Sequence, residues 1–209
     1  MTPNNGCSYI HSKAYDDLPT GPPGTGGGGT TYIRWGRITC PNTSGTTLVY
    51  KGIASGSFYN QGGGVDFLCL PEDPEFLQFT AGQQTWRAKL HGAEYELHPP
   101  APAYNNIFQH NVPCAVCYTP NRGTMLRIPA KVNCPTSWTR EYYGYLMSHA
   151  SRHPQRNTFE CMDVNPVPLP GSVADTNGAL FYLTETTCNG IPCGPYADGK
   201  EIPCVVCTK

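Results

Sequence analysis

A cysteine pattern that occurs twice constrains the fold of this chain more than any other feature. Each occurrence has a Cys-Pro pair, a middle cysteine (Cys69 or Cys161) and a terminal Cys-x-x-Cys, and the two are 90 to 94 residues apart. Residues 37–41 (RITCP) thus correspond to residues 131–135 (KVNCP), and VPCAVC corresponds to IPCVVC. Because several anchors recur in the same order at near-constant spacing, we predict a tandem duplication of one unit.

The duplication divides the chain into three parts. Residues 1–30 form a flexible Gly/Pro-rich arm that ends in a collagen-like remnant (GPPGTGGGG), residues 31–122 form the first copy, and residues 123–209 form the second. Three Gly-led triplets are too few to hold a collagen triple helix. Cys188 and Cys193 flank an Asn-Gly turn in an insertion of the second copy and can close a hairpin. Cys7 is left over, so we expect it to be a free thiol or an interchain bridge.

The cysteines are expected to form disulfides rather than a zinc site. The two Cys-x-x-Cys motifs, Cys114/Cys117 and Cys204/Cys207, lie about 90 residues apart, whereas the two halves of a structural zinc site are usually about 12 to 20 residues apart. Disulfides are typical of secreted, extracellular proteins. Each set of four cysteines allows three pairings, and spacing alone does not choose among them.

Composition limits the fold class and the partners. The chain contains 23 Gly and 21 Pro, which disfavour long helices. Short segments rich in β-branched and aromatic residues predict strands near residues 46–50, 65–69, 179–183 and 203–206, and by equivalence at 139–151. A net charge of −1 argues against a nucleic acid partner, and no apolar run is long enough for a membrane span. We therefore expect a mainly β, disulfide-rich fold in which two copies of one β unit pack as a pseudo-twofold single globule.

Several motifs carry a resemblance to a known family. They are TYIRWGRITCP, TLVYKG, FLCLPEDPEF, GAEYE, NVPCAVC, FECMD, NGALFY and IPCVVCTK. Over residues 31–209 the chain resembles the carboxy-terminal domain of invertebrate, sponge-type short-chain collagens. More distantly, it is similar to the noncollagenous carboxy-terminal domain of type IV collagen.

The resemblance implies both a disulfide pairing and a function. The implied pairs are Cys40–Cys117, Cys69–Cys114, Cys134–Cys207 and Cys161–Cys204, with Cys188–Cys193 as the small hairpin. The implied function is that of a secreted, non-catalytic extracellular matrix or adhesion module. Such a module self-associates into a homo-oligomer such as a trimer, or joins other matrix chains.

One polar cluster is a candidate metal site. On a strand, Glu94, Glu96 and His98 would share one face, and two carboxylates with an imidazole can hold a divalent cation. The acidic turn at residues 72–75 is a second candidate, for calcium. We favour a solvated strand face and an acidic turn instead, because Leu180 and Tyr182 stand where the second copy would repeat the first ligand set. No resident cofactor is therefore expected.

Aromatic residues support an alternative function. Trp138, Tyr142, Tyr143 and Tyr145 could form a surface for glycans, as in a soluble carbohydrate-binding lectin of mucus or innate defence. Asn42 begins the glycosylation sequon Asn-Thr-Ser, which is consistent with a secreted surface loop.

We do not expect an enzyme. The chain has no Gly-x-Ser-x-Gly motif and no Gly-rich phosphate loop followed by Lys. A metal-dependent enzyme using Glu94, Glu96 and His98 is the least favoured of the three functions.

Overall fold

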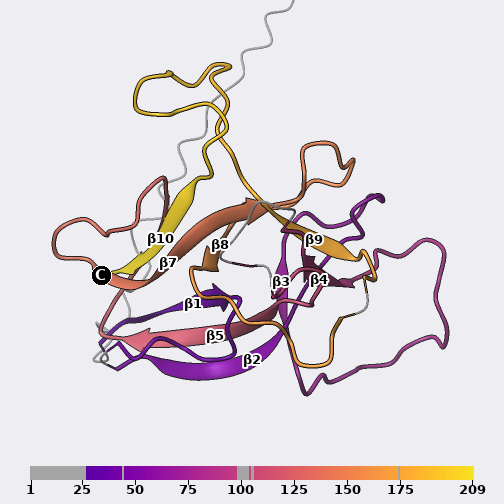
Figure 1. Cartoon of the computed structure of the whole chain (residues 1–209). Helices are drawn as coiled ribbons and strands as arrows, with labels where there is room; N and C mark the ends of the chain where they lie inside the picture. Colours follow the sequence, from indigo (N-terminus) through magenta and orange to yellow (C-terminus); the bar gives the residue numbers. More distant parts are fainter. Residues whose placement is uncertain (1–26, 44, 98–103, 105, 174) are drawn as a thin grey trace, which may run out of the picture.

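The computed structural model describes residues 27–43, 45–97, 104, 106–173 and 175–209. Within this part of the chain the regular structure is almost entirely β, which confirms the predicted fold class (Figure 1). The strands are β1 (Gly29–Trp35), β2 (Thr47–Gly56), β3 (Leu68–Pro71), β4 (His91–Tyr95), β5 (Pro113–Pro120), β6 (Met125–Pro129), β7 (Thr139–Ser148), β8 (Glu160–Asp163), β9 (Ala179–Leu183) and β10 (Pro203–Thr208). None of the described residues belongs to a helix long and apolar enough to cross a membrane.

Seven strands form a closed barrel. Their order is β7–β8–β1–β5–β2–β4–β9, and β9 pairs back onto β7. Outside this ring, β10 and then β6 extend from β7, whereas β3 pairs with β2. Because β1, β2, β4 and β5 come from the first half and the other three from the second, the two halves build one barrel together.

The strand pairings of the two halves correspond. β5 pairs with β1 and β2, and β2 also pairs with β3 and β4; likewise β10 pairs with β6 and β7, and β7 also pairs with β8 and β9. A β-bulge skips Val49 in the first half and Glu141 in the second, and these positions are equivalent in the repeat. This is what a tandem duplication would produce. The residue bounds of the copies and their twofold relation stay predictions.

The barrel interior is shared between the halves. Trp35, Phe67 and Tyr95 of the first half lie in the same buried cluster as Met147 and Phe181 of the second. Phe67 and Phe181 stack with ring centroids 3.8 Å apart. Parallel pairing of β4 with β9, and of β1 with β8 at a single residue pair, joins the halves along the barrel wall. One contiguous core therefore stabilises both halves.

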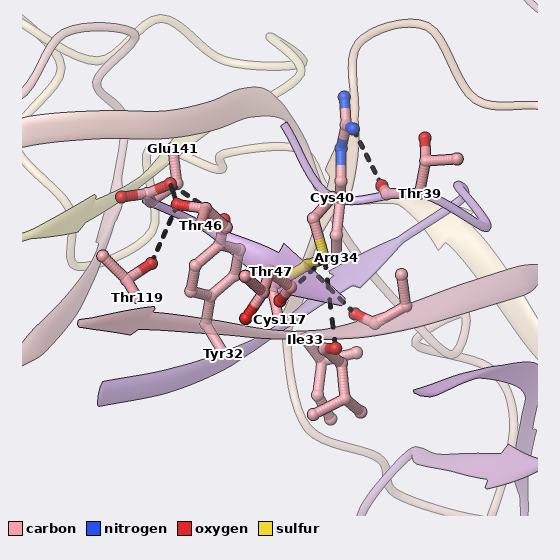
Figure 2. Close-up of a disulfide and its surroundings, with 12 residues drawn as sticks. Tyr32, Ile33, Arg34, Thr39, Cys40, Thr46, Thr47, Cys117, Thr119 and Glu141 are labelled. Carbon is pink, nitrogen blue, oxygen red and sulfur yellow. Dashed lines mark hydrogen bonds between the residues drawn. A yellow bond between two sulfur atoms is a disulfide. The ribbon is translucent and has the colours of Figure 1, made fainter. Parts of the chain in front are cut away.

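Five disulfides hold the described residues together. The structure pairs Cys40 with Cys117, Cys69 with Cys114, Cys134 with Cys207, Cys161 with Cys204 and Cys188 with Cys193, and these are the pairs that the resemblance implies. The first of them is drawn in Figure 2, where it ties the connection after β1 to β5. The four large loops span 43 to 77 residues, and closing each stabilises the fold by about 4 kcal/mol in the chain-entropy model. Cys7 lies outside the described residues.

Two glycines at equivalent positions, Gly52 in β2 and Gly144 in β7, let a short neighbouring strand approach closely. A Cβ atom on Gly52 would collide with the backbone carbonyl of Leu70, and one on Gly144 would collide with that of Met162. These carbonyls belong to β3 and β8, which carry the disulfide cysteines Cys69 and Cys161. The backbone needs glycine there because β2–β3 and β7–β8 approach more closely than a side chain allows.

We predict that Gly144→Ala lowers the free energy of unfolding by about 3 kcal/mol or more, because a rigid backbone carbonyl must move to admit the methyl group. Denaturant unfolding with the disulfides intact measures the change. Gly123→Ala is the matched control, since its Cβ would meet no atom within 4 Å. Equal stability of the two variants would contradict the close approach.

A neutral histidine supports the closure of the barrel. His149 directly follows β7, and its Nε2 accepts hydrogen bonds from the backbone N–H of Leu180 in β9 at 3.1 Å and from the Asn157 amide at 3.3 Å. Its Nδ1 lies 3.2 Å from the carbonyl oxygen of Gln155 and donates to it. Burial lowers the pKa of His149 to about 4, since a charged imidazole would lose both water and its role as an acceptor.

We predict that His149 makes the fold acid-sensitive. Its pKa is lower in the folded chain than in the unfolded chain, so the unfolded state binds more protons and stability falls as the pH drops from about 6.5 towards 4. The loss should be about 1–2 kcal/mol by pH 5 after allowance for solvent screening. Unfolding free energies of the wild type and His149→Phe across this range measure it. Parallel pH profiles for the two proteins would refute the assignment.

Candidate functional site

The longest connection of the first half exposes large apolar side chains. We call residues 76–86 the apolar segment; it lies between β3 and β4, in the long loop that projects from the barrel in Figure 1. The side chains of Phe76, Leu77, Phe79 and Trp86 are 79, 93, 80 and 97% exposed. A single exposed apolar residue is ordinary, but four within eleven residues form a patch typical of interaction sites.

An apolar cavity lies on another part of the same molecule. It has a volume of about 410 Å³ and lies between β1 and β6, the two strands that are equivalent in the repeat. Its apolar lining includes Ile33, Phe67, Val116 and Val206. The chain therefore has both an exposed apolar segment and a separate cavity whose lining is partly apolar.

An ion pair forms the polar side of this cavity. Arg127 of β6 pairs with Glu160 of β8, and the indole N–H of Trp35 donates to the same carboxylate at 3.1 Å. Burial raises the pKa of Glu160, and the guanidinium of Arg127 partly opposes this effect. The carboxylate is therefore held in place by residues from both halves.

The structure brings acidic residues together near β4, but in a different set from the predicted one. Carboxylate oxygens of Glu94, Glu96 and Asp175 all lie within 4.8 Å of one another. His98, the predicted third ligand, lies outside the described residues. Asp175 belongs to the other half, just before β9, so strand periodicity around Glu94 could not identify it.

Glu94 and Glu96 are buried, with 0% and 5% of their surface exposed, so the favoured interpretation as a solvated strand face is wrong. The Glu94 carboxylate accepts hydrogen bonds from the backbone N–H groups of Thr176 at 2.9 Å and Asn177 at 3.2 Å, and from the Thr176 hydroxyl. Burial, followed by the charges of Glu94 and Asp175, raises the pKa of Glu96 to about 7. Three carboxylates at this spacing are oxygen ligands of the kind that calcium takes, and the metal site stays a prediction.

The acidic turn at residues 72–75 is exposed, and Glu72 forms an ion pair with Lys51 at 3.1 Å.

Of the predicted aromatic surface, Tyr142 is buried, with its hydroxyl 2.8 Å from the carbonyl oxygen of Ile33. Tyr143 is half-buried with the guanidinium of Arg140 4.8 Å from its ring centroid.

The other two aromatic residues are also half-buried. Tyr145 packs edge-on against Tyr104 with ring centroids 6.0 Å apart, and the backbone N–H of Trp138 donates to Pro135. The four rings thus have different surroundings, and their role in glycan binding stays a prediction. Asn42 is exposed in the connection between β1 and β2, where a glycan could be attached.

A buried carboxylate that sequence reasoning missed joins the two halves. The side chain of Glu141 is fully buried. One oxygen accepts a hydrogen bond from the Tyr32 hydroxyl at 2.8 Å (Figure 2). The same oxygen accepts from the Thr43 hydroxyl at 2.7 Å, and both donors belong to the first half. The other accepts from Thr208 at 2.6 Å and forms an ion pair with Arg122.

The repeat contained one signal for this carboxylate. Glu141 stands at the bulge position where the first half has the exposed Val49, so the two copies differ there in both charge and burial. Burial and the Glu141 charge also raise the pKa of Tyr32, which keeps this phenol protonated as a donor. A second ion pair between the halves, Arg34–Asp163 at 2.7 Å, is also largely buried.

We predict that Glu141→Ala lowers the free energy of unfolding by about 3 kcal/mol or more, because it leaves Arg122 and three hydroxyl groups without their shared acceptor. Thermal and denaturant unfolding measure the effect. Val49→Ala at the equivalent bulge is the matched control and should change stability by less than about 0.5 kcal/mol. Similar losses in both variants would show that the bulge, rather than the carboxylate, matters.

The comparisons with known proteins do not extend these findings. No protein-family model matches the chain, and no curated protein matches it significantly.

Proposed function

We propose that this protein is a secreted, non-catalytic extracellular matrix or adhesion module that self-associates through its disulfide-rich domain. The observation that carries the proposal is the apolar segment, whose four large side chains face solvent in the single chain. Burying a large apolar side chain stabilises a contact by about 1.5–3 kcal/mol. Four of them contribute about 6–12 kcal/mol, which is of the same order as the cost of about 4–15 kcal/mol for association.

The partner that fits best is a second copy of the chain. The cavity between β1 and β6 combines apolar side chains with the Arg127–Glu160 ion pair, and no residue of the apolar segment lines it. A contact between two different surfaces of identical chains is head-to-tail, and it closes into a ring when the rotation permits. A trimer, which the resemblance to collagen carboxy-terminal domains implies, is the smallest ring of this kind.

Two further features support an extracellular matrix setting. The five disulfides are compatible with a secreted protein, because such bonds persist in oxidising compartments. The Gly-Pro-Pro-Gly stretch in residues 21–24 is of the kind that precedes such a domain in a collagen chain. The lectin surface built from Trp138, Tyr142, Tyr143 and Tyr145 has less support, since these four rings lie in different surroundings. The metal-dependent enzyme has less support as well, because His98 lies outside the described residues.

We predict that the protein forms a homo-oligomer that depends on the apolar segment and does not depend on an interchain disulfide. Sedimentation equilibrium of the full chain, with Cys7 blocked and unblocked, measures the association constant. Phe76→Ser/Phe79→Ser should weaken association at least a hundredfold, since each lost side chain is worth about tenfold or more.

The matched control is Leu48→Ser/Val49→Ser, which removes two exposed apolar side chains from β2. It should leave the association constant within about threefold. A wild-type protein that stays monomeric at 0.1 mM, or an oligomer that both variants retain equally, would overturn the proposal. Circular dichroism of each variant establishes that it is folded.

A further inference from the structure

A small polar pocket lies at the base of the loop that carries the apolar segment. Its volume is about 180 Å³. The connection after β2 contributes Phe58, Gln61 and Gly62, and the residues leading into and starting β4 contribute Thr85, Arg87, Lys89 and His91. Two long connections of the first half therefore meet around this pocket.

The pocket concentrates positive charge. Arg87, Lys89 and His91 occupy alternate positions of the chain, and all three line the pocket. No Asp or Glu lines it. Among the described residues, neither Arg87 nor Lys89 forms an ion pair, whereas Arg34, Arg122 and Arg127 each pair with a carboxylate. Within the described part of the chain, these two cations thus have no carboxylate partner in a concave site.

The other lining groups can donate hydrogen bonds. Gln61 offers an amide N–H₂ and Thr85 a hydroxyl group. The Nε2 of His91 is buried without a hydrogen-bond partner among the described residues, which is an uncommon state for a polar atom. A ligand rich in oxygen acceptors would satisfy these donors together.

We propose that this pocket binds a sulfate group of a sulfated polysaccharide. A sulfate monoester is a fixed anion with oxygens that accept from a guanidinium and an ammonium group at the same time. The pocket volume admits the sulfate and part of the attached sugar ring. Sulfated polysaccharides occur outside cells, the compartment that the disulfides indicate.

The lining of the pocket is almost entirely polar, which suits a sulfated sugar better than an apolar ligand. The ring of Phe58 packs against Tyr59 and His91, with ring centroids 4.9 and 5.2 Å away. Beside the two cations, Gln61 and Thr85 can form hydrogen bonds with the hydroxyl groups of a sugar. We therefore expect the sulfated sugar to bind more tightly than inorganic sulfate.

Isothermal titration of the full chain with a highly sulfated heparin hexasaccharide at 0.15 M salt tests the proposal. Arg87→Gln/Lys89→Gln should weaken binding at least tenfold. The matched control, Lys131→Gln/Lys200→Gln, removes two exposed cations of the second half and the same net charge. It should change the affinity by less than about twofold.

Further titrations use inorganic sulfate, inorganic phosphate and the chemically desulfated hexasaccharide. Weaker binding of all three than of the sulfated hexasaccharide supports the proposal. It is overturned if the wild type does not bind the sulfated hexasaccharide, if the control pair loses as much affinity as the pocket pair, or if any of the three binds equally well. Phe76→Ser/Phe79→Ser removes no pocket residue, so titration of this variant separates sulfate binding from self-association.

Discussion

Four disulfides anchored on β5 and β10, the two strands that carry the Cys-x-x-Cys motifs, hold the fold together. Residues three apart on a strand point to opposite faces, so Cys114 and Cys117 of β5 form disulfides on different sides of the sheet. Cys114 bridges to β3 within the barrel core, and Cys117 bridges to the connection after β1 in the second buried cluster. β10 repeats the pairing through Cys204 and Cys207, but its Cys161–Cys204 disulfide lies in the second buried cluster and not in the barrel core. β5 and β10 are thereby each held by disulfides on both faces, which stabilises a fold of short strands and long loops.

Differences between the copies join them into one molecule. Glu141 replaces an exposed valine at the shared bulge and binds groups from both halves, and Arg34–Asp163 adds a second largely buried ion pair. A buried charge costs free energy unless it is paired and hydrogen-bonded, so these contacts favour one arrangement of the halves over others. The disulfide pattern that recurs in both halves and the buried charges that do not recur thus have separate roles. The disulfides stabilise each half, and the charges fix how the halves meet.

The connection between β3 and β4 combines two surfaces with different chemistry. Its apolar segment exposes side chains that another protein surface would bury, and the residues that follow it place Arg87 and Lys89 in a polar pocket. A module that assembles through the first surface and binds sulfated polysaccharide through the second would display several sulfate sites per oligomer. Linked sites raise the overall affinity for a long polymer well above that of one site.

The sequence alone was enough to predict the β class, the repeated pattern and the two equivalent sets of cysteines, because composition, periodicity and spacing can be read along the chain. It also indicated that residues 139–151 form a strand, since the equivalent first-copy segment reads as one. The three-dimensional arrangement was needed to show that Asp175 joins Glu94 and Glu96, that Glu141 lies at the junction of the halves, and that the connection after β2 meets Arg87 and Lys89 in one pocket. Those arrangements bring together residues far apart in the chain, and strand pairing and barrel closure place them.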